Sequence, residues 1–128
     1  MSTEGGLSRI HQIAMRAHDI DRAIRFYRDV LGIPFLFSAP PSLAFFDCAG
    51  VRLMLSAPEA GFDHPGSVLY FAVDDIQQSH AALASRGVVF RTTPHKIATL
   101  TDREVWLADF TDSEENVLAL MSEPRISR

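Results

Sequence analysis

The chain has 128 residues, a formal net charge of −4 and a hydrophobic fraction of 47%. This length fits one domain, or two small halves that share a core, and the composition is typical of a soluble globular protein. The net negative charge and the dispersed Lys and Arg residues argue against a nucleic-acid partner, and no apolar run is long enough to predict a membrane-spanning helix. The single cysteine excludes an internal disulfide, so we expect a cytoplasmic protein.

Two segments of the chain share the same order of features. Residues 18–35 begin with a predicted helix cap at Asp19, continue with apolar residues at helical spacing, and end at Gly32, which Pro34 follows. Residues 75–90 repeat this order: Asp-Ile, a short helical run, then Gly, a β-branched residue, a spacer and Phe. The repetition indicates two diverged copies of one unit.

The segments around these helices alternate apolar and polar residues, which is typical of strands. In the first half, the expected strands cover residues 9–17, 35–38, 43–47 and 51–56. In the second half, they cover residues 68–73, 88–92, 104–110 and 117–121, with a long polar connection at 93–103. Each half therefore reads β-α-β-β-β, which predicts an α+β fold.

The Pro- and Gly-rich stretches of the chain predict where each module begins and ends. We expect a disordered N-terminal tail at residues 1–8, a first βαβββ module at 9–56, a linker at 57–66, a second βαβββ module at 67–121 and a C-terminal tail at 122–128. The linker is long enough for the two modules to pair within one chain or to exchange between two chains. The sequence leaves that choice open.

The first helical segment resembles a known family. Residues 19–32, DIDRAIRFYRDVLG, are similar to the pattern D-l-x-r-S-x-x-F-Y-x-x-v-L-G of the vicinal oxygen chelate superfamily, which contains glyoxalase I, bleomycin-resistance proteins and extradiol dioxygenases. Residues 73–76 add support, as do residues 112–116, which read DSEEN where the family has DPDGN. The resemblance implies two modules whose curved sheets close around a cavity, commonly in a homodimer, with a divalent metal in the enzymatic members.

The resemblance also implies four metal-ligand positions, and only the first carries a suitable donor here. These positions correspond to Gln12, Met54, Val68 and Ala119. His11 lies beside the first, but a shift of one residue along a strand turns a side chain to the opposite face. One neutral amide does not hold a divalent ion, which needs three or four nitrogen or oxygen ligands. We therefore expect no cofactor, and a divalent metal held at other positions is the alternative.

Strand alternation predicts which side chains line the cavity. Most of them are apolar, whereas Arg16 and Arg52 are able to bind an anion. The predicted lining consists of Gln12, Ala14, Arg16, Arg52, Met54, Ser56, Val68, Tyr70, Ala119 and Met121. The Phe residues at 35, 37, 45 and 46 are expected in the core or at a dimer interface. No catalytic residue can be assigned, and the roles of His80 and His95 stay open.

Three functions are compatible with this sequence. The absence of metal ligands and the apolar lining favour a homodimeric protein that binds a small apolar or aromatic molecule, as bleomycin-resistance proteins do. The alternative is an enzyme, either a metal-dependent lyase, isomerase or dioxygenase-like protein with displaced ligands, or a metal-independent one that uses Tyr70 or His95; Gln12 is its main support. The third is a structural or partner-binding subunit. The identity of the ligand and the existence of catalysis stay open.

Overall fold

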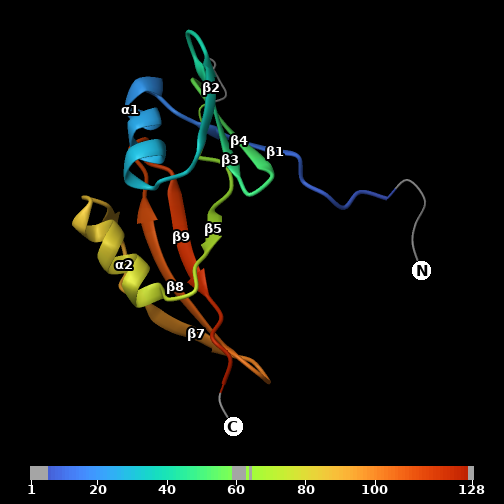
Figure 1. Ribbon diagram of the computed structural model, residues 1–128, viewed down its shortest axis with the longest axis vertical. Coiled ribbons are helices and arrows are strands. Elements are labelled where there is room, and N and C mark those ends of the chain that lie inside the picture. The colour runs from blue at the N-terminus through green and yellow to red at the C-terminus, as the bar shows by residue number, and fades with distance from the viewer. Residues whose placement is uncertain (1–5, 59–62, 64, 127–128) are drawn as a thin grey trace.

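Two β-sheets, each with one helix against it, make up the protein in the computed structural model (Figure 1). The structure describes residues 6–58, 63 and 65–126. Much of the predicted tail at 1–8 and of the linker at 57–66, and the last two residues of the predicted tail at 122–128, lie outside the described residues. Both helices lie on the same side of the two sheets, so the opposite side of each sheet is left without a helix (Figure 1).

The first sheet, sheet A, contains the four strands of the first half of the chain. These are β1 (Gln12–Arg16), β2 (Phe35–Ala39), β3 (Leu43–Cys48) and β4 (Val51–Ser56). Their order is β1-β4-β3-β2, with β1 parallel to β4 and the other neighbours antiparallel. The parallel pair requires a crossover connection, which the first helix and the two strands that follow it provide.

The second sheet, sheet B, repeats this topology with one addition. It contains β5 (Leu69–Ala72), β6 (Val89–Phe90), β7 (His95–Thr99), β8 (Glu104–Thr111) and β9 (Val117–Ser122). Strand β5 is parallel to β9, as β1 is to β4. The prediction of a strand at 88–92 followed by a long polar connection at 93–103 differs from the structure in detail. The segment pairs with β8 twice, through short β6 and through β7.

The two helices begin alike but differ in their last turns. Helix α1 (Ile20–Ile24) continues as a π-helical segment, η1 (Arg25–Val30), whereas α2 (Ile76–Ser85) is α-helical throughout. The first repeat has one more residue between its Asp-Ile start and its Gly than the second repeat has. A π-helical turn accommodates one extra residue without shifting the residues before it. Sequence periodicity alone did not reveal this insertion.

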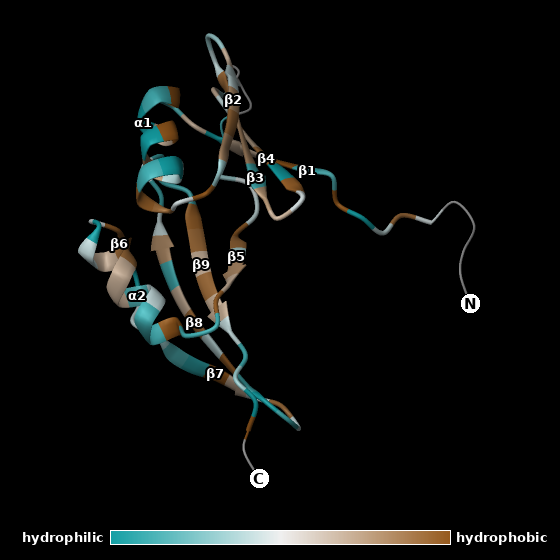
Figure 2. Ribbon diagram, viewed as in Figure 1, coloured by the Kyte–Doolittle hydropathy of each residue, from teal (hydrophilic) through white to brown (hydrophobic). Residues whose placement is uncertain are grey.

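Apolar side chains fill the space between each sheet and its helix. In sheet A, Met15, Leu53 and Leu55 are buried on the side that faces α1, as strand alternation predicted. Buried Phe46 contacts the ring of buried Tyr27, with the ring centroids 5.8 Å apart. Figure 2 shows β9 as a largely hydrophobic strand, while both helices carry hydrophilic residues as well. The core is thus continuous from one module to the other.

A buried polar cluster joins the first module to the turn between β8 and β9. The Tyr27 hydroxyl donates a hydrogen bond of 2.6 Å to Asp112. The Asn116 amide donates to the same carboxylate at 2.8 Å and to the Arg16 carbonyl at 2.9 Å. Burial raises the pKa of Tyr27 well above its usual range, and the Asp112 carboxylate adds to this effect. The phenol therefore keeps the proton that it donates.

Glu114 completes this cluster and also caps helix α1. Its carboxylate accepts hydrogen bonds from the Asp19 backbone N–H at 2.8 Å and from Arg22 Nε at 2.7 Å. The adjacent Glu114 and Glu115 differ in their surroundings. Glu114 is a cap for a helix of the other module, and its side chain is fully buried. Glu115 is exposed and adopts a φ of 69°, the conformation that the glycine of the family motif adopts without cost.

We predict that replacing Glu114 by Gln destabilises the protein most strongly near neutral pH. Burial raises the pKa of Glu114, but its hydrogen bonds from Arg22, Asp19 and Ser113 outweigh burial and hold the pKa below its usual value. A lowered folded-state pKa contributes stability above the unfolded-state value of about 4.3, and this stability disappears as the pH falls through the folded-state pKa. Near pH 7 the substitution should cost about 1–3 kcal/mol.

Urea unfolding at a series of pH values measures this difference between wild type and E114Q. The difference should shrink below a pH of about 4. The matched control is E115Q, which removes the neighbouring exposed carboxylate and should change stability by less than about 0.5 kcal/mol. Equal losses in both variants, or a loss for E114Q that does not depend on pH, would contradict the role of this carboxylate.

Candidate functional site

The side of sheet A that faces away from α1 carries the residues predicted to line the cavity in the first module. The parallel pairing of β1 with β4 sets them side by side in three pairs. These pairs are Gln12 with Arg52, Ala14 with Met54, and Arg16 with Ser56. Their shared face follows from the alternation of side chains along each strand.

The Gln12 side chain already contacts two neighbours on this face. Its amide oxygen accepts a hydrogen bond of 2.6 Å from Arg52 Nε, and its amide nitrogen lies 3.7 Å from the Met54 sulfur. The Arg52 guanidinium therefore binds the Gln12 amide oxygen, which the resemblance assigns as a metal ligand. A permanent positive charge beside that oxygen opposes the binding of a divalent cation. The residues at the family's metal positions do not fit the metal.

An aromatic row extends from Arg52 across sheet A, over buried Phe45 to exposed Phe37. The Arg52 guanidinium carbon lies 5.4 Å from the ring centroid of Phe45, and this ring stacks on Phe37 with a centroid distance of 4.6 Å. Phe37 is 48% exposed. The sequence placed both Phe residues in the core or at an interface; Phe45 is buried, whereas the exposure of Phe37 and the stacking of the two rings were not predicted. Alternation could have found the row, because Phe45 precedes buried Phe46 and therefore points to the opposite face.

A cavity of about 500 Å³ lies at the end of this face, and Arg16 is its main polar group. Ala14, Met54 and Ser56 also line it. Arg16 Nη1 pairs with Asp63 at 2.9 Å, while its buried Nε has no hydrogen-bond partner among the described residues.

Asp63 holds two basic groups near this cavity. Its second carboxylate oxygen lies 2.9 Å from His18 Nε2. The His18 and Arg16 contacts together outweigh burial and lower the pKa of Asp63 below its usual range, with the His18 hydrogen bond as the largest cause. The Asp63 carboxylate is thus a counterion that the chain itself supplies to Arg16. Asp63 could not be found from the sequence, because a single Asp in a Pro- and Gly-rich segment belongs to no recognisable pattern.

The predicted lining residues of the second module lie on sheet B, apart from those of the first. Tyr70 pairs with Ala119 in the parallel ladder of β5 and β9, Met121 follows on β9, and Val68 directly precedes β5. Tyr70 and Val68 are exposed, whereas Ala119 is buried. Tyr70 and Met121 line a different cavity of about 330 Å³. The structure thus divides the predicted set into two groups.

The other candidate groups have ordinary local partners. The His80 ring lies 4.2 Å from the Phe90 ring, and His95 Nδ1 lies 2.8 Å from the Thr93 carbonyl oxygen. Burial and the neighbouring Asp47 raise the pKa of the Cys48 thiol, which disfavours a reactive thiolate. Within the described part of the chain, no three His, Cys, Asp or Glu side chains come together as metal ligands. No described helix has the length and apolarity to span a membrane.

The chain is similar to several known proteins. A family model described as the Glyoxalase/Bleomycin resistance protein/Dioxygenase superfamily matches residues 9–120. The uncharacterized protein YraH of Bacillus subtilis (strain 168) is 25% identical over 126 residues, which cover 85% of this chain and 94% of YraH.

Solved structures show the same fold. The lactoylglutathione lyase of Agrobacterium tumefaciens superimposes with a TM-score of 0.73 and 21% identity, covering 91% of this chain and 95% of that one. TnmS3, an antibiotic binding protein from Streptomyces sp. CB03234, has a TM-score of 0.72 and 22% identity, with 92% and 98% covered. These identities support the fold and not an activity. Together with the family model, they show that this chain belongs to the glyoxalase/bleomycin resistance protein/dioxygenase superfamily.

Proposed function

We propose that this protein binds a small apolar or aromatic molecule on the helix-free face of sheet A and does so without a metal ion. The observation that carries this proposal is the row formed by Phe37, Phe45 and Arg52. An exposed ring stacked on a second ring offers a flat surface for a third. Arg52 adds a positive charge at one end, and aromatic surfaces with a few polar groups are typical of ligand sites.

The polar groups along this face support a ligand that also carries an acceptor. Arg52 uses Nε to bind Gln12, which leaves the two terminal nitrogens of its guanidinium to other acceptors. Arg16 has a buried Nε without a partner among the described residues. A planar molecule with a carboxylate or a carbonyl oxygen would satisfy these donors. The antibiotic-binding relative TnmS3 has the same fold, which makes a binding role plausible for this chain.

A second copy of the chain completes the site in this proposal. The predicted lining residues occupy two separate sheets, and their exposed members include large apolar side chains. Phe37, Val68 and Tyr70 are 48%, 41% and 56% exposed. A homodimer in which the face of sheet A meets sheet B of the partner would cover these side chains and combine both groups. A cytoplasmic location stays a prediction.

The homodimer is testable by light scattering coupled to size-exclusion chromatography. We expect twice the mass of the chain at micromolar concentration. Replacing Tyr70 by Glu should shift the mass toward that of a monomer, because a buried carboxylate without a partner opposes association. The control places Glu at Ala81, which is exposed on helix α2 and therefore lies on the other side of the sheets. A wild-type protein of monomer mass would contradict the shared site.

Ligand binding on sheet A is testable with naphthoate, which has a flat ring system and one carboxylate. We expect F37A and R52Q each to weaken its binding about fivefold to tenfold in isothermal titration calorimetry. The matched control is L36A, since Leu36 is as exposed as Phe37 but contributes no ring to the row. Equal affinities of F37A, L36A and wild type would contradict the proposed platform.

The alternative function, a metal-dependent lyase, isomerase or dioxygenase-like enzyme, is supported by the amide of Gln12 at a family metal position. Elemental analysis of protein dialysed without a chelator separates the two. We expect far less than one divalent ion per chain, because Arg52 occupies the Gln12 oxygen. A stoichiometric metal that is lost in Q12A but kept in the control Q77A, which changes an exposed Gln on α2, would favour the enzyme.

A further inference from the structure

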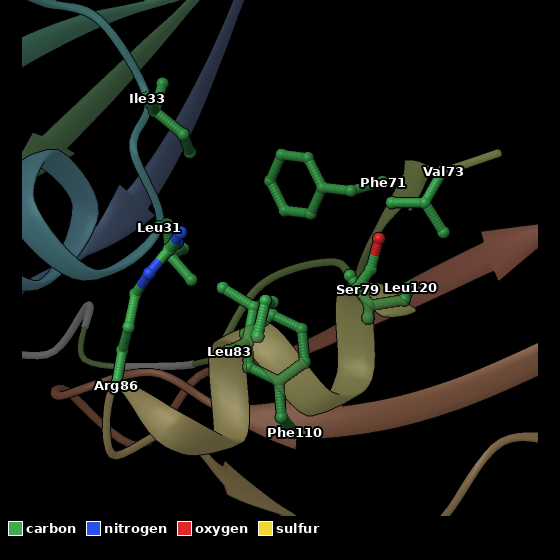
Figure 3. A pocket seen from close by; sticks show the side chains of 10 residues that line it. Leu31, Ile33, Phe71, Val73, Ser79, Leu83, Arg86, Phe110 and Leu120 are labelled. Atoms are coloured by element: carbon green, nitrogen blue, oxygen red, sulfur yellow. The ribbon is translucent and has the colours of Figure 1, made fainter. Parts of the chain in front are cut away.

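A second apolar cleft lies on the helix-bearing side of the sheets, between the end of η1 and helix α2 (Figure 3). Its volume is about 290 Å³. Helix α2 lines it with four residues at positions i, i+3, i+4 and i+7, which are Ser79, Ala82, Leu83 and Arg86. Leu31 closes the side toward the first module, and Phe71 and Phe110 close the side toward sheet B. The cleft shares no lining residue with the cavity on sheet A.

Arg86 places a positive charge at the edge of this apolar cleft. Its Nη1 donates a hydrogen bond of 3.1 Å to the Val30 carbonyl at the end of η1. A guanidinium has five N–H donors, so this contact leaves four of them for other acceptors. Among the described residues, no carboxylate forms an ion pair with Arg86. The exposed arginine is therefore anchored over the cleft without being neutralised.

Ser79 adds a second polar group inside the cleft. A serine within a helix commonly bonds to a backbone carbonyl of the preceding turn, as Ser85 does with the Ala82 carbonyl at 2.7 Å. The Ser79 hydroxyl makes no such bond within the described chain. Figure 3 shows its oxygen turned toward Phe71 and Val73, at the open side of the cleft. The hydroxyl and the guanidinium thus lie at opposite ends of the cleft (Figure 3).

We propose that this cleft is a separate binding site for a small amphipathic carboxylate, such as a medium-chain fatty acid. The carboxylate pairs with the Arg86 guanidinium, which matches its planar geometry with two parallel N–H groups. The hydrocarbon chain lies among Leu31, Phe71 and Leu83, where it buries their exposed area. The volume is at the lower end of the range of about 300–1,000 Å³ for small-molecule pockets, which favours a short chain.

Octanoate and octanol, which share a chain length but differ in charge, test this proposal by calorimetry. Wild type should bind octanoate in a saturable one-to-one complex with a Kd at or below about 1 mM. R86Q should bind octanoate at least about tenfold more weakly and bind octanol within about twofold of wild type. R25Q, which removes an exposed arginine on η1 outside the cleft, is the charge-matched control. Equal octanoate affinities in R86Q and R25Q would overturn the proposal.

The position of the bound chain is tested by filling the cleft. In A82F the new ring should occupy the cleft and abolish binding of both probes, whereas A81F adds the same ring at an exposed position of α2 and should bind both normally. Amide NMR spectra check that each variant is folded. In wild type, octanoate should shift the amide signals of Leu31, Phe71 and Leu83. Shifts confined to the face of sheet A, or unchanged binding in folded A82F, would overturn the site.

Discussion

The buried carboxylates of the β8-β9 turn are the constraint on which the arrangement of the two modules depends. Glu114 and Asp112 lie in the second module, yet they accept hydrogen bonds from Tyr27, Arg22 and the Asp19 N–H, which lie in the first helical segment or at its start. A buried carboxylate that loses its partners costs more free energy than an exposed ion pair contributes. A displacement of one module against the other that broke these hydrogen bonds would leave the carboxylates buried without partners. The polar cluster therefore sets the relative position of the sheets more precisely than apolar packing alone.

That fixed arrangement has opposite consequences on the two sides of the sheets. On the helix-bearing side, α1 meets the β8-β9 turn while α2 remains separated from the end of η1, so a cleft persists at Leu31 and Leu83. On the helix-free side, neither sheet is covered within the described chain, and apolar side chains such as Phe37 and Tyr70 stay exposed. We propose a small ligand for the cleft and a second copy of the chain for the helix-free side.

The elements of the fold were largely predictable, because caps, glycines and alternation are local signals. Asp19 and Asp75 cap their helices as predicted, each accepting from the backbone N–H three residues on. The π-helical turn was not predictable, since an extra residue inside an amphipathic run leaves the sequence pattern intact. Strand β7 was missed because its exposed residues do not alternate clearly in hydropathy. The burial of Glu114 depends on Arg22, a residue distant in the chain, and no local pattern reports such a partner.

The candidate site illustrates the same limit at the level of single atoms. Register along one strand was enough to distinguish Gln12 from His11 and to place Arg52 beside Gln12 once β1 and β4 were paired. The contacts that Arg52 makes, which decide the chemistry of this position, could be seen only in the three-dimensional structure. Arg52 bonds the Gln12 oxygen and also lies over Phe45, so a single side chain both displaces the cation site and extends the aromatic surface. An arginine beside a retained ligand position thus converts a place that attracts cations into one that attracts anions and aromatic rings.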